Sequence, residues 1–443
     1  MSDVVTVRPP RQLRGTIAIP GDKSVTHRAV MFNALARGEA RIDGFLDAAD
    51  TRSTVECMRA LGAEVRDLGG GALAIRGTGR GGLHEPDDVL DCGNSGTTMR
   101  LLSGVLAGLP MLSVLTGDDS LRRRPMARIV RPLASLGAHI TARAEGTLPP
   151  IVIQGGPLRG GQTIETPVAS AQVKSALLLA SLAADGPIRV VQPAQSRDHT
   201  ERLLEAMGAR IEVDGASVTI TPPAGDLEAV DVSVPGDIST AAAWIVAACI
   251  HPDAELLLTG VGVNETRTGL LDILEAMGAD IQRLEERTTG GEPVADLLVR
   301  SSTLRGTVVG GDLVPRAIDE LPLVALAAAF AEGETVIQDA AELRVKESDR
   351  VATTAASLRA FGIDVSEADD GMSVRGGSGL RGGAPLRGAA VESSGDHRLA
   401  MLGAVAGLVA EGETAVHGAE AVTVSYPEFW AELARLGATS VAV

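Results

Sequence analysis

Three lysines stand out in a chain in which 37 of the 40 basic side chains are arginines. They are Lys23 in GDKSVTHR, Lys174 in SAQVKS and Lys346 in LRVKESDR. Arginine serves wherever charge alone is enough, so we interpret the three exceptions as positions that need a compact ammonium group with three donors. Compositional drift is the alternative. Each lysine lies near an expected turn-to-helix junction beside other polar groups, which favours a chemical role.

Polar strings precede six alanine-rich segments that are expected to form buried helices. The strings are GDKSVTHR, GNSGTTMR, VASAQVKS, PGDIST, AIDELP and SSGDHR. Unpaired amides and the helix dipole make such helix starts favourable for anions. N-capping by Ser, Thr and Asp is the alternative, but it does not explain the cations at the same edges. These cations are Lys23, Arg28, Arg100, Lys174 and Arg398.

Two further segments concentrate charge. Residues 122–124 are three arginines, and residues 346–350 (KESDR) are expected to open a helix. A spacing of four would place Lys346 and Arg350 on one helix face, and a spacing of three would place Glu347 beside Arg350. A solvated charged face is the alternative. The functional interpretation predicts a small substrate with several negative charges.

Composition indicates a globular protein with large cores. Its 443 residues suggest two or three domains, and 45% are hydrophobic while only 2% are aromatic. A net charge of −17 argues against general binding of nucleic acid or anionic membranes. The three cysteines lie far apart, which suggests a reducing compartment. The sequence has no CxxC or HxxxH pair, so we expect no structural zinc site. With no apolar segment at the N-terminus, we expect a cytoplasmic protein.

A repeat divides the chain into six similar stretches. LGA or a close variant recurs every 70 to 84 residues, with a helical pattern before it and a strand-like pattern after it. Its glycine fits a left-handed helix C-cap. Each unit therefore holds one buried helix, one amphipathic helix and several strands, which is too long for a common solenoid repeat. The six glycines are Gly62, Gly137, Gly208, Gly278, Gly362 and Gly437.

Two similar tetrapeptides separate these units into three and three. Residues 19–22 read IPGD and residues 234–237 read VPGD, and Pro-Gly is strong turn punctuation. We expect the chain to cross twice between two halves. One domain would comprise residues 21–235 and the other residues 1–20 plus 236–443, with a ligand between them.

In chain order, these strings closely resemble the 5-enolpyruvylshikimate-3-phosphate (EPSP) synthase family. GDKSVTHR, GNSGTTMR, LRRRPM, SAQVKSALLLA, SRDHTERLL, IDELP, LRVKESDR, GDHRLAM and SYPEF cover nearly the whole chain. SAQVKS and SRDHTE resemble the second class of that family, typical of a subset of bacteria. The resemblance implies a two-domain inside-out α/β barrel of six βαβαββ units, with the active site in the interdomain cleft.

The resemblance also implies a reaction. The enolpyruvyl group of phosphoenolpyruvate would pass to the 5-hydroxyl of shikimate 3-phosphate, with release of phosphate, in the pathway to chorismate and the aromatic amino acids. Both substrates carry a phosphate and a carboxylate, as the basic clusters require. We expect no cofactor, no metal, no nucleic-acid or membrane partner, and a monomer.

The family's site residues carry over by motif. Shikimate 3-phosphate would contact Lys23, Ser24, Arg28, Ser170, Ala171, Gln172, Ser196, Arg197, Asp319 and Lys346. Phosphoenolpyruvate would contact Lys23, Gly96, Arg124, Gln172, Arg350 and Arg398. Asp319 would accept the hydroxyl proton, Glu347 would exchange a proton at carbon, and Lys23 would stabilise developing charge. The split of acid and base roles among these groups stays open, because it depends on geometry.

This sequence departs from the first class of the family at three positions. Val424 and Glu342 stand where that class has a lysine and an asparagine, which puts two substrate contacts in doubt. Lys174 stands where that class has an apolar residue. It either supports the shikimate phosphate site or neutralises a neighbouring carboxylate. At Gly96 a methyl group is expected to hinder the phosphonate inhibitor glyphosate more than phosphoenolpyruvate.

Two other functions compete with this interpretation. The sister enzyme that uses UDP-N-acetylglucosamine shares the fold but has a GAKNA-type start and usually a reactive cysteine near the arginine-rich segment, where this chain has none. A ring-shaped DNA clamp also repeats six αβ units but lines its hole with basic helices, whereas the inner helices here are apolar. Residues 77–82 (GTGRGG) lack the following helix of a dinucleotide site and are expected to form a turn.

Overall fold

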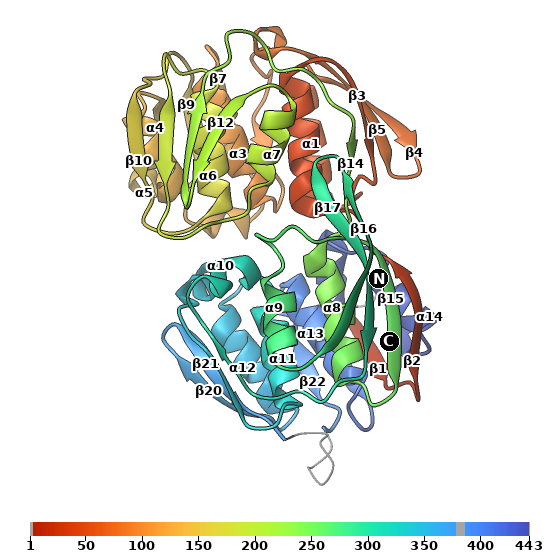
Figure 1. Ribbon diagram of the computed structural model, residues 1–443. Helices are drawn as coiled ribbons and strands as arrows, with labels where there is room; N and C mark the ends of the chain where they lie inside the picture. Colours follow the sequence, from red (N-terminus) through yellow and green to blue (C-terminus); the bar gives the residue numbers. More distant parts are fainter. Residues whose placement is uncertain (1–2, 378–385, 443) are drawn as a thin grey trace. The chain divides into compact units, whose positions relative to one another are not determined.

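The computed structural model of the protein describes residues 3–377 and 386–442 and divides the chain into two compact units (Figure 1). One unit, called the 21–235 unit below, consists of Gly21–Pro235 together with Thr288–Glu292. The other, called the 236–443 unit, consists of Met1–Pro20, Gly236–Arg287 and Pro293–Val443. The chain therefore passes from one unit to the other between Pro20 and Gly21 and between Pro235 and Gly236, and again on either side of the short segment Thr288–Glu292.

The 21–235 unit forms three four-stranded sheets from its described residues. In each sheet an edge strand pairs in parallel with its neighbour, and the other pairs are antiparallel. The sheet orders are β14 (Val232–Ser233), β3 (Arg37–Asp43), β5 (Ala72–Thr78), β4 (Glu64–Gly69); β6 (Leu90–Asp91), β7 (Leu112–Thr116), β9 (Leu148–Gln154), β8 (His139–Ala142); and β10 (Gln162–Glu165), β11 (Ile188–Val191), β13 (Ser217–Thr221), β12 (Arg210–Asp214).

The described part of the 236–443 unit repeats this plan with three more sheets of four strands. In each of these sheets, one edge strand again runs parallel to the strand next to it. That second strand runs antiparallel to the third. Their orders are β22 (Ala390–Glu392), β23 (Thr414–His417), β1 (Val4–Arg8), β24 (Thr439–Ala442); β16 (Asp280–Thr289), β17 (Glu292–Arg300), β15 (Ala254–Gly262), β2 (Leu13–Ala18); and β18 (Val308–Val309), β19 (Glu334–Ile337), β21 (Gly371–Arg375), β20 (Asp364–Ala368).

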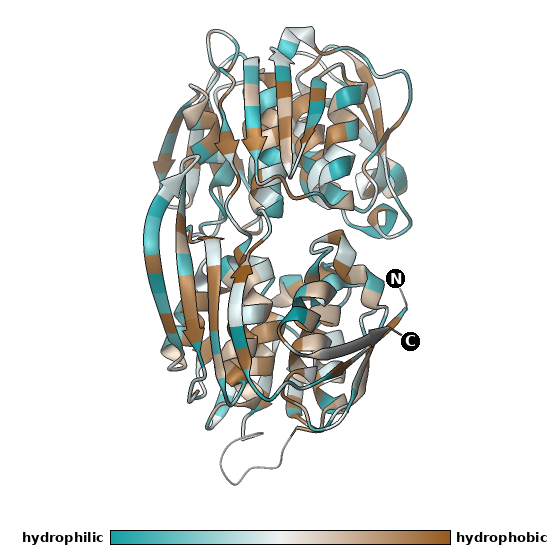
Figure 2. Cartoon of the chain, turned by 90° about the vertical axis from the view of Figure 1, so that its right-hand side faces the viewer, coloured by the Kyte–Doolittle hydropathy of each residue, from teal (hydrophilic) through white to brown (hydrophobic). Residues whose placement is uncertain are grey.

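Six helices form the interior of the units, as the alanine-rich segments predict. All thirteen residues of α8 are buried, and the other five helices are buried over most of their length. The strands around them alternate between hydrophilic and hydrophobic residues (Figure 2). Within the described chain these helices are α1 (Lys23–Leu35), α3 (Gly96–Ala107), α6 (Ala171–Ser181), α8 (Ile238–Ile250), α11 (Leu321–Ala329) and α13 (His397–Gly407).

A second set of helices is amphipathic and precedes the repeated glycines. All six glycines have φ between 83° and 99°, which confirms the predicted left-handed caps. The helices are α2 (Ala49–Ala60), α4 (Ala127–Ser135), α7 (His199–Ala206), α9 (Gly269–Ala276), α12 (Arg350–Ala360) and α14 (Phe429–Arg435). Shorter turns are α5 (Arg143–Gly146), α10 (Leu313–Ala317), η1 (Arg80–Gly82), η2 (Leu121–Arg123), η3 (Ala341–Val345) and η4 (Ala419–Val424). Across residues 3–377 and 386–442, no helix has the length and apolar character needed to cross a membrane.

One sequence-based expectation about helix geometry is wrong. Helix α12 begins at Arg350 and not at Lys346, because the Asp349 carboxylate accepts hydrogen bonds from the amides of Val351 and Ala352 and caps the helix there. Lys346 instead follows the last residue of the short turn η3. Lys346 and Arg350 therefore do not share a helix face. The turn predicted for residues 77–82 is confirmed for its last part only, since β5 extends to Thr78 and the turn η1 comprises Arg80–Gly82.

Candidate active site

Helix α1 presents Lys23 from its first turn. The Asp22 carboxylate caps this helix by accepting from the amide of Val25 at 2.9 Å. Lys23 is the first helical residue, and its Nζ lies 3.1 Å from the Asp50 carboxylate, which comes from the first turn of α2. The Lys23 side chain is 20% exposed. The ammonium group is thus partly exposed at the start of α1.

Arg28 lies one turn further along α1 and is buried. Its hydrogen-bond partners in the described chain are two hydroxyls and a carbonyl: Thr200 Oγ1 at 2.7 Å, Ser175 Oγ at 2.8 Å and Ser24 O at 2.9 Å. Burial lowers the pKa of Arg28 to about 10, an effect opposed by the charge of Glu201 and assisted by that of Arg197. Arg28 stays cationic at neutral pH and has only neutral hydrogen-bond partners, so it suits an anionic ligand.

The starts of α3 and α6 are joined through Gln172. Its side-chain amide donates to Thr97 Oγ1 at 2.9 Å, and its carbonyl accepts from the Arg100 guanidinium. Thr97 and Arg100 are on α3, whereas Gln172 is on α6 next to Ala171, its first residue. Two helix starts, with their unpaired amides, are therefore held side by side.

Gly96 opens α3 between two arginines. A Cβ at this position would lie 2.8 Å from one terminal nitrogen of Arg100 and 3.5 Å from one of Arg124. Arg124 follows the turn η2, and it donates to Asn94 Oδ1 at 2.6 Å. A Cβ would crowd two guanidinium groups at this helix start, and a helix start beside two cations is favourable for an anion.

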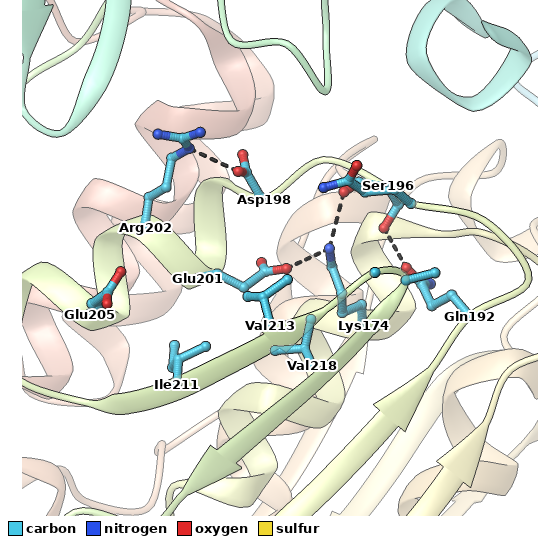
Figure 3. Close-up of a pocket in the computed structure, with 13 residues that line it drawn as sticks. Lys174, Gln192, Ser196, Asp198, Glu201, Arg202, Glu205, Ile211, Val213 and Val218 are labelled. Atoms are coloured by element: carbon cyan, nitrogen blue, oxygen red, sulfur yellow. Dashed lines mark hydrogen bonds and ion pairs between the residues drawn. The ribbon is translucent and has the colours of Figure 1, made fainter. Parts of the chain in front are cut away.

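Ser170 and Ser196 are tied together by Gln192. Ser196 donates to Gln192 Oε1 at 2.5 Å, and the Gln192 amide donates to the carbonyl of Ser170 at 3.1 Å. Ser170 also caps α6. Figure 3 shows the bond between Ser196 and Gln192. The segment that carries Ser196 and Arg197 is therefore fixed against the start of α6.

The 236–443 unit gathers a second cluster around Arg350, whose side chain is 1% exposed. The guanidinium donates to Glu347 Oε2 at 2.7 Å, Asp396 Oδ2 at 2.8 Å and Asp319 Oδ1 at 3.1 Å. Helix α12 supplies Arg350, α13 is capped by Asp396, and Asp319 lies just before α11. Three segments thus place carboxylates around one buried cation.

Asp319 is a point of contact for three cations. Besides Arg350, its carboxylate lies 3.6 Å from Lys346 Nζ and 3.9 Å from the Arg398 guanidinium. Arg398 also lies 3.9 Å from Glu320 Oε1. Asp319 is therefore the carboxylate at which the three cations of this cluster converge.

Opposing effects act on the charges of this cluster. Burial acts to lower the pKa of Arg350, but attraction to Glu347, Asp396 and Asp319 outweighs it and raises the pKa above its usual value. Burial acts to raise the pKa of Asp396, but the charges of Arg350 and His397 lower it overall. Both groups therefore stay ionised at neutral pH.

Some residues of these clusters were not found from the sequence. Asp50, the partner of Lys23, lies in no string that the sequence analysis singled out, and Thr200, the partner of Arg28, lies in SRDHTERLL but was not predicted as a site residue. Asp396 and Glu320 lie in GDHR and IDELP beside predicted site residues, and their position next to helix starts could have indicated them. Among the residues that the structure describes, no group of three His, Cys, Asp or Glu side chains could hold a metal ion.

The two units share one architecture, sheets around buried helices, and each carries a cluster of cations at helix starts. This combination defines an α/β protein built to bind small anions. Residues 7–433 match the family described as EPSP synthase (3-phosphoshikimate 1-carboxyvinyltransferase). The chain belongs to the EPSP synthase family.

Similar proteins agree with this assignment. The chain is 55% identical over 436 residues to a 3-phosphoshikimate 1-carboxyvinyltransferase of Roseiflexus sp., covering 98% of this chain and 99% of the relative. It is 54% identical over 434 residues to the protein of that name from Chloroflexus aggregans, covering 98% of each.

Solved structures show the same fold. An EPSP synthase from Acinetobacter baumannii superimposes with a TM-score of 0.88 at 43% identity, covering 99% of each chain. The enolpyruvyl transferase NikO from Streptomyces tendae gives a TM-score of 0.80 at 21% identity, covering 99% of this chain and 98% of NikO. The fold class predicted from the sequence is confirmed.

Proposed function

We propose that the chain transfers the enolpyruvyl group of phosphoenolpyruvate to the 5-hydroxyl of shikimate 3-phosphate, giving 5-enolpyruvylshikimate 3-phosphate and phosphate. This reaction belongs to the shikimate pathway, which leads to chorismate and the aromatic amino acids. The family match over residues 7–433 carries the proposal. The clusters support it, because both substrates are multiply anionic and both clusters present cations at helix starts.

In the 21–235 unit, we assign the binding of shikimate 3-phosphate to the Arg28 network and the Ser196 segment. The neutral partners of Arg28 leave its charge available, and Arg197 adds a second charge nearby. The proposed contacts are Lys23, Ser24, Arg28, Ser170, Ala171, Gln172, Ser196 and Arg197. For the phosphate of phosphoenolpyruvate we propose Lys23, Gly96, Arg124 and Gln172.

In the 236–443 unit, Arg350 and Arg398 are proposed to receive the carboxylate of phosphoenolpyruvate. Asp319 and Lys346 are proposed to contact the ring hydroxyls of shikimate 3-phosphate. Because these roles divide each substrate between two units, both clusters must act on the same pair of molecules. An active site in the interdomain cleft stays a prediction.

The chemistry moves two protons. The methylene carbon of phosphoenolpyruvate gains one while the attacking hydroxyl loses one. The resulting tetrahedral adduct then eliminates phosphate as its new methyl group gives up a proton, which restores the double bond. We assign proton exchange at carbon to Glu347, whose side chain is 26% exposed and so accessible. Asp319 accepts the hydroxyl proton, and Lys23 stabilises charge between the substrates. General acid–base groups of this kind typically contribute about 10²- to 10⁴-fold in rate.

Three accompanying expectations rest on the sequence. The net charge of −17 disfavours nucleic acid and anionic membranes as partners. The separated cysteines fit a reducing compartment such as the cytoplasm. A monomer without cofactor or metal stays a prediction.

The test measures phosphate release from phosphoenolpyruvate under three conditions: with shikimate 3-phosphate, with UDP-N-acetylglucosamine, and with no second substrate. We expect phosphate release only in the condition that contains shikimate 3-phosphate. Release that does not depend on it would refute the proposal, and release with the nucleotide sugar would favour the sister enzyme. A gel-shift experiment with duplex DNA tests the alternative of a DNA clamp, and we expect no complex with DNA.

A further inference from the structure

Lys174 forms a buried ion pair that no part of the reaction above uses. Its side chain is 3% exposed and that of Glu201 is 6% exposed, and Lys174 Nζ lies 2.5 Å from Glu201 Oε1. The ammonium also donates to the main-chain carbonyl of Ser196 at 3.1 Å. Figure 3 shows Lys174 between these two acceptors. One buried cation therefore joins α6, α7 and the segment that precedes α7.

Such a pair is a costly way to fill a core position. Desolvation of two charges can exceed their attraction, so apolar residues of similar volume are often as stable or more stable. Glu201 Oε2 is buried and has no hydrogen-bond partner among the described residues, so its carboxylate depends on Lys174 for compensation. Stability alone does not account for the pair.

The pair lies beside the Arg28 network. Ser175, the neighbour of Lys174 on α6, is 2.6 Å from the hydroxyl of Thr200, the neighbour of Glu201 on α7. Both hydroxyls accept from Arg28. Two adjacent links, one neutral and one ionic, thus hold α6 and α7 together.

The second acceptor of Lys174 is what gives the pair a role. The side chain of Ser196 is already fixed through Gln192 to the carbonyl of Ser170. Lys174 fixes the main chain of the same residue. Ser196 is thereby held at both its side chain and its backbone, directly before Arg197.

We propose that Lys174 is a positioning residue for shikimate 3-phosphate, which holds the Ser196 carbonyl, with Glu201 as its counter-ion, so that Ser196 and Arg197 face the phosphate group. The inference rests on the proposed function. It predicts that Lys174 sets the affinity for shikimate 3-phosphate and not the affinity for phosphoenolpyruvate, whose proposed phosphate contacts lie at α3.

A pocket of about 390 Å³ gives access to this pair. Lys174 and Glu201 line it together with Glu205 and with Asp198, which is paired with Arg202 (Figure 3). A small organic cation added to the solution can therefore reach the position of a deleted ammonium group. Truncation to alanine removes three carbons and a nitrogen, which n-propylammonium replaces.

The first experiment separates positioning from stability with Lys174→Met and the double variant Lys174→Met/Glu201→Gln. We expect Lys174→Met to lower Tm because Glu201 is left buried and unpaired, and the double variant to recover most of that loss. In both variants the KM for shikimate 3-phosphate should rise about tenfold or more, as expected for loss of a charge-assisted hydrogen bond. The KM for phosphoenolpyruvate should stay within about twofold.

The matched control is Arg189→Met. Arg189 pairs with Asp214 at 3.1 Å on the surface of the same unit, with side chains 45% and 85% exposed, and should change neither KM. If the KM for shikimate 3-phosphate recovers together with Tm in the double variant, the pair is only structural and the proposal fails. If Lys174→Met does not fold, the double variant decides alone.

The second experiment is rescue of Lys174→Ala by n-propylammonium, with tetramethylammonium as the control because it has no N–H donor. We expect only the primary amine to lower the KM for shikimate 3-phosphate. Equal effects of the two cations would contradict a donor role. The wild-type enzyme separates the two proposals: absence of phosphate release that depends on shikimate 3-phosphate refutes the function, whereas an active wild type with normal KM values in the Lys174 variants refutes this inference alone.

Discussion

The two clusters treat their central arginines in opposite ways. In the 21–235 unit, Arg28 hydrogen-bonds to hydroxyls of Thr200 and Ser175 and to a carbonyl. In the 236–443 unit, Arg350 is surrounded by three carboxylates. The first arrangement keeps positive charge available, whereas the second compensates it. We infer that the 21–235 cluster chiefly binds anions and that the 236–443 cluster chiefly orients the carboxylates that move protons.

The largest effect is expected from Arg350→Met. Three carboxylates would lose their shared cation in a buried setting, so the free energy of unfolding should fall by about 3–5 kcal/mol. Activity should fall by about 10³-fold or more, because Asp319 and Glu347 lose their orientation. Urea unfolding and the phosphate-release assay measure the two effects.

The control on the same helix is Arg359→Met. Arg359 pairs with Glu367 at 2.7 Å with side chains 48% and 32% exposed, so about 0–1 kcal/mol is expected. If the two arginine variants lose equal stability, the carboxylates around Arg350 do not depend on it, and the contrast between the clusters disappears.

Lys23→Arg and Lys346→Arg test whether each cluster needs an ammonium group. Both substitutions keep the charge but change its shape, and each lysine faces a carboxylate, Asp50 at 3.1 Å and Asp319 at 3.6 Å. We expect kcat/KM to fall at least about tenfold in each, or about 1.4 kcal/mol. Arg37→Lys, at an exposed ion pair with Asp226, is the control and should leave kcat/KM unchanged. Near-normal activity in both variants would refute the role inferred for the rare lysines.

Gly96→Ala tests the proposed phosphate site at the start of α3, and its expected effect is smaller than that of the lysine substitutions. The added methyl group would lie 2.8 Å from Arg100, the far end of a flexible side chain, so the fold should tolerate it. We expect the inhibition constant for glyphosate to rise more than the KM for phosphoenolpyruvate, because the inhibitor is longer. Gly225→Ala, where nothing lies within 4 Å of the added Cβ, should change neither constant. Equal increases for inhibitor and substrate would contradict the prediction.

The smallest expected effect is on the pH dependence of stability, which differs between His27 in the 21–235 unit and Asp396 in the 236–443 unit. Burial lowers the pKa of His27, and the charges of Lys23 and Arg28 lower it further, so the unfolded chain takes up a proton first as pH falls below about 6.5. Stability linked to His27 is therefore lost on acidification from that pH. The pKa of Asp396 is also lowered, so its contribution is present above about 3.9 and is lost only as pH falls below that value.

We expect His27→Gln to lose less stability than the wild type between pH 7.5 and pH 5, by up to about 2 kcal/mol. Below pH 4 both proteins should show a further loss, which belongs to carboxylates such as Asp396. Urea unfolding at a series of pH values measures both windows. A wild type and variant with parallel curves throughout would show that His27 is not the titrating group.

Local sequence patterns were enough to predict the helices and their caps. They could not predict contacts between residues that are far apart in the sequence. The buried helices and the six glycine caps follow from alanine-rich runs and the LGA repeat, because both are local signals. The partners of the site residues do not, since Asp50 is 27 residues from Lys23 and Thr200 is 172 residues from Arg28. The start of α12 was misplaced because the competing cap, Asp349, lies inside the charged segment itself.

The division of roles between the clusters is tested most directly by calorimetric titration of shikimate 3-phosphate into the wild type, Arg28→Met and Glu347→Gln. We predict that Arg28→Met weakens binding by about tenfold or more, since a buried charged contact is lost. Glu347→Gln should keep its Kd within about twofold of the wild type, although its kcat falls about 10²- to 10⁴-fold. Equal loss of shikimate 3-phosphate binding in the two variants would contradict the account.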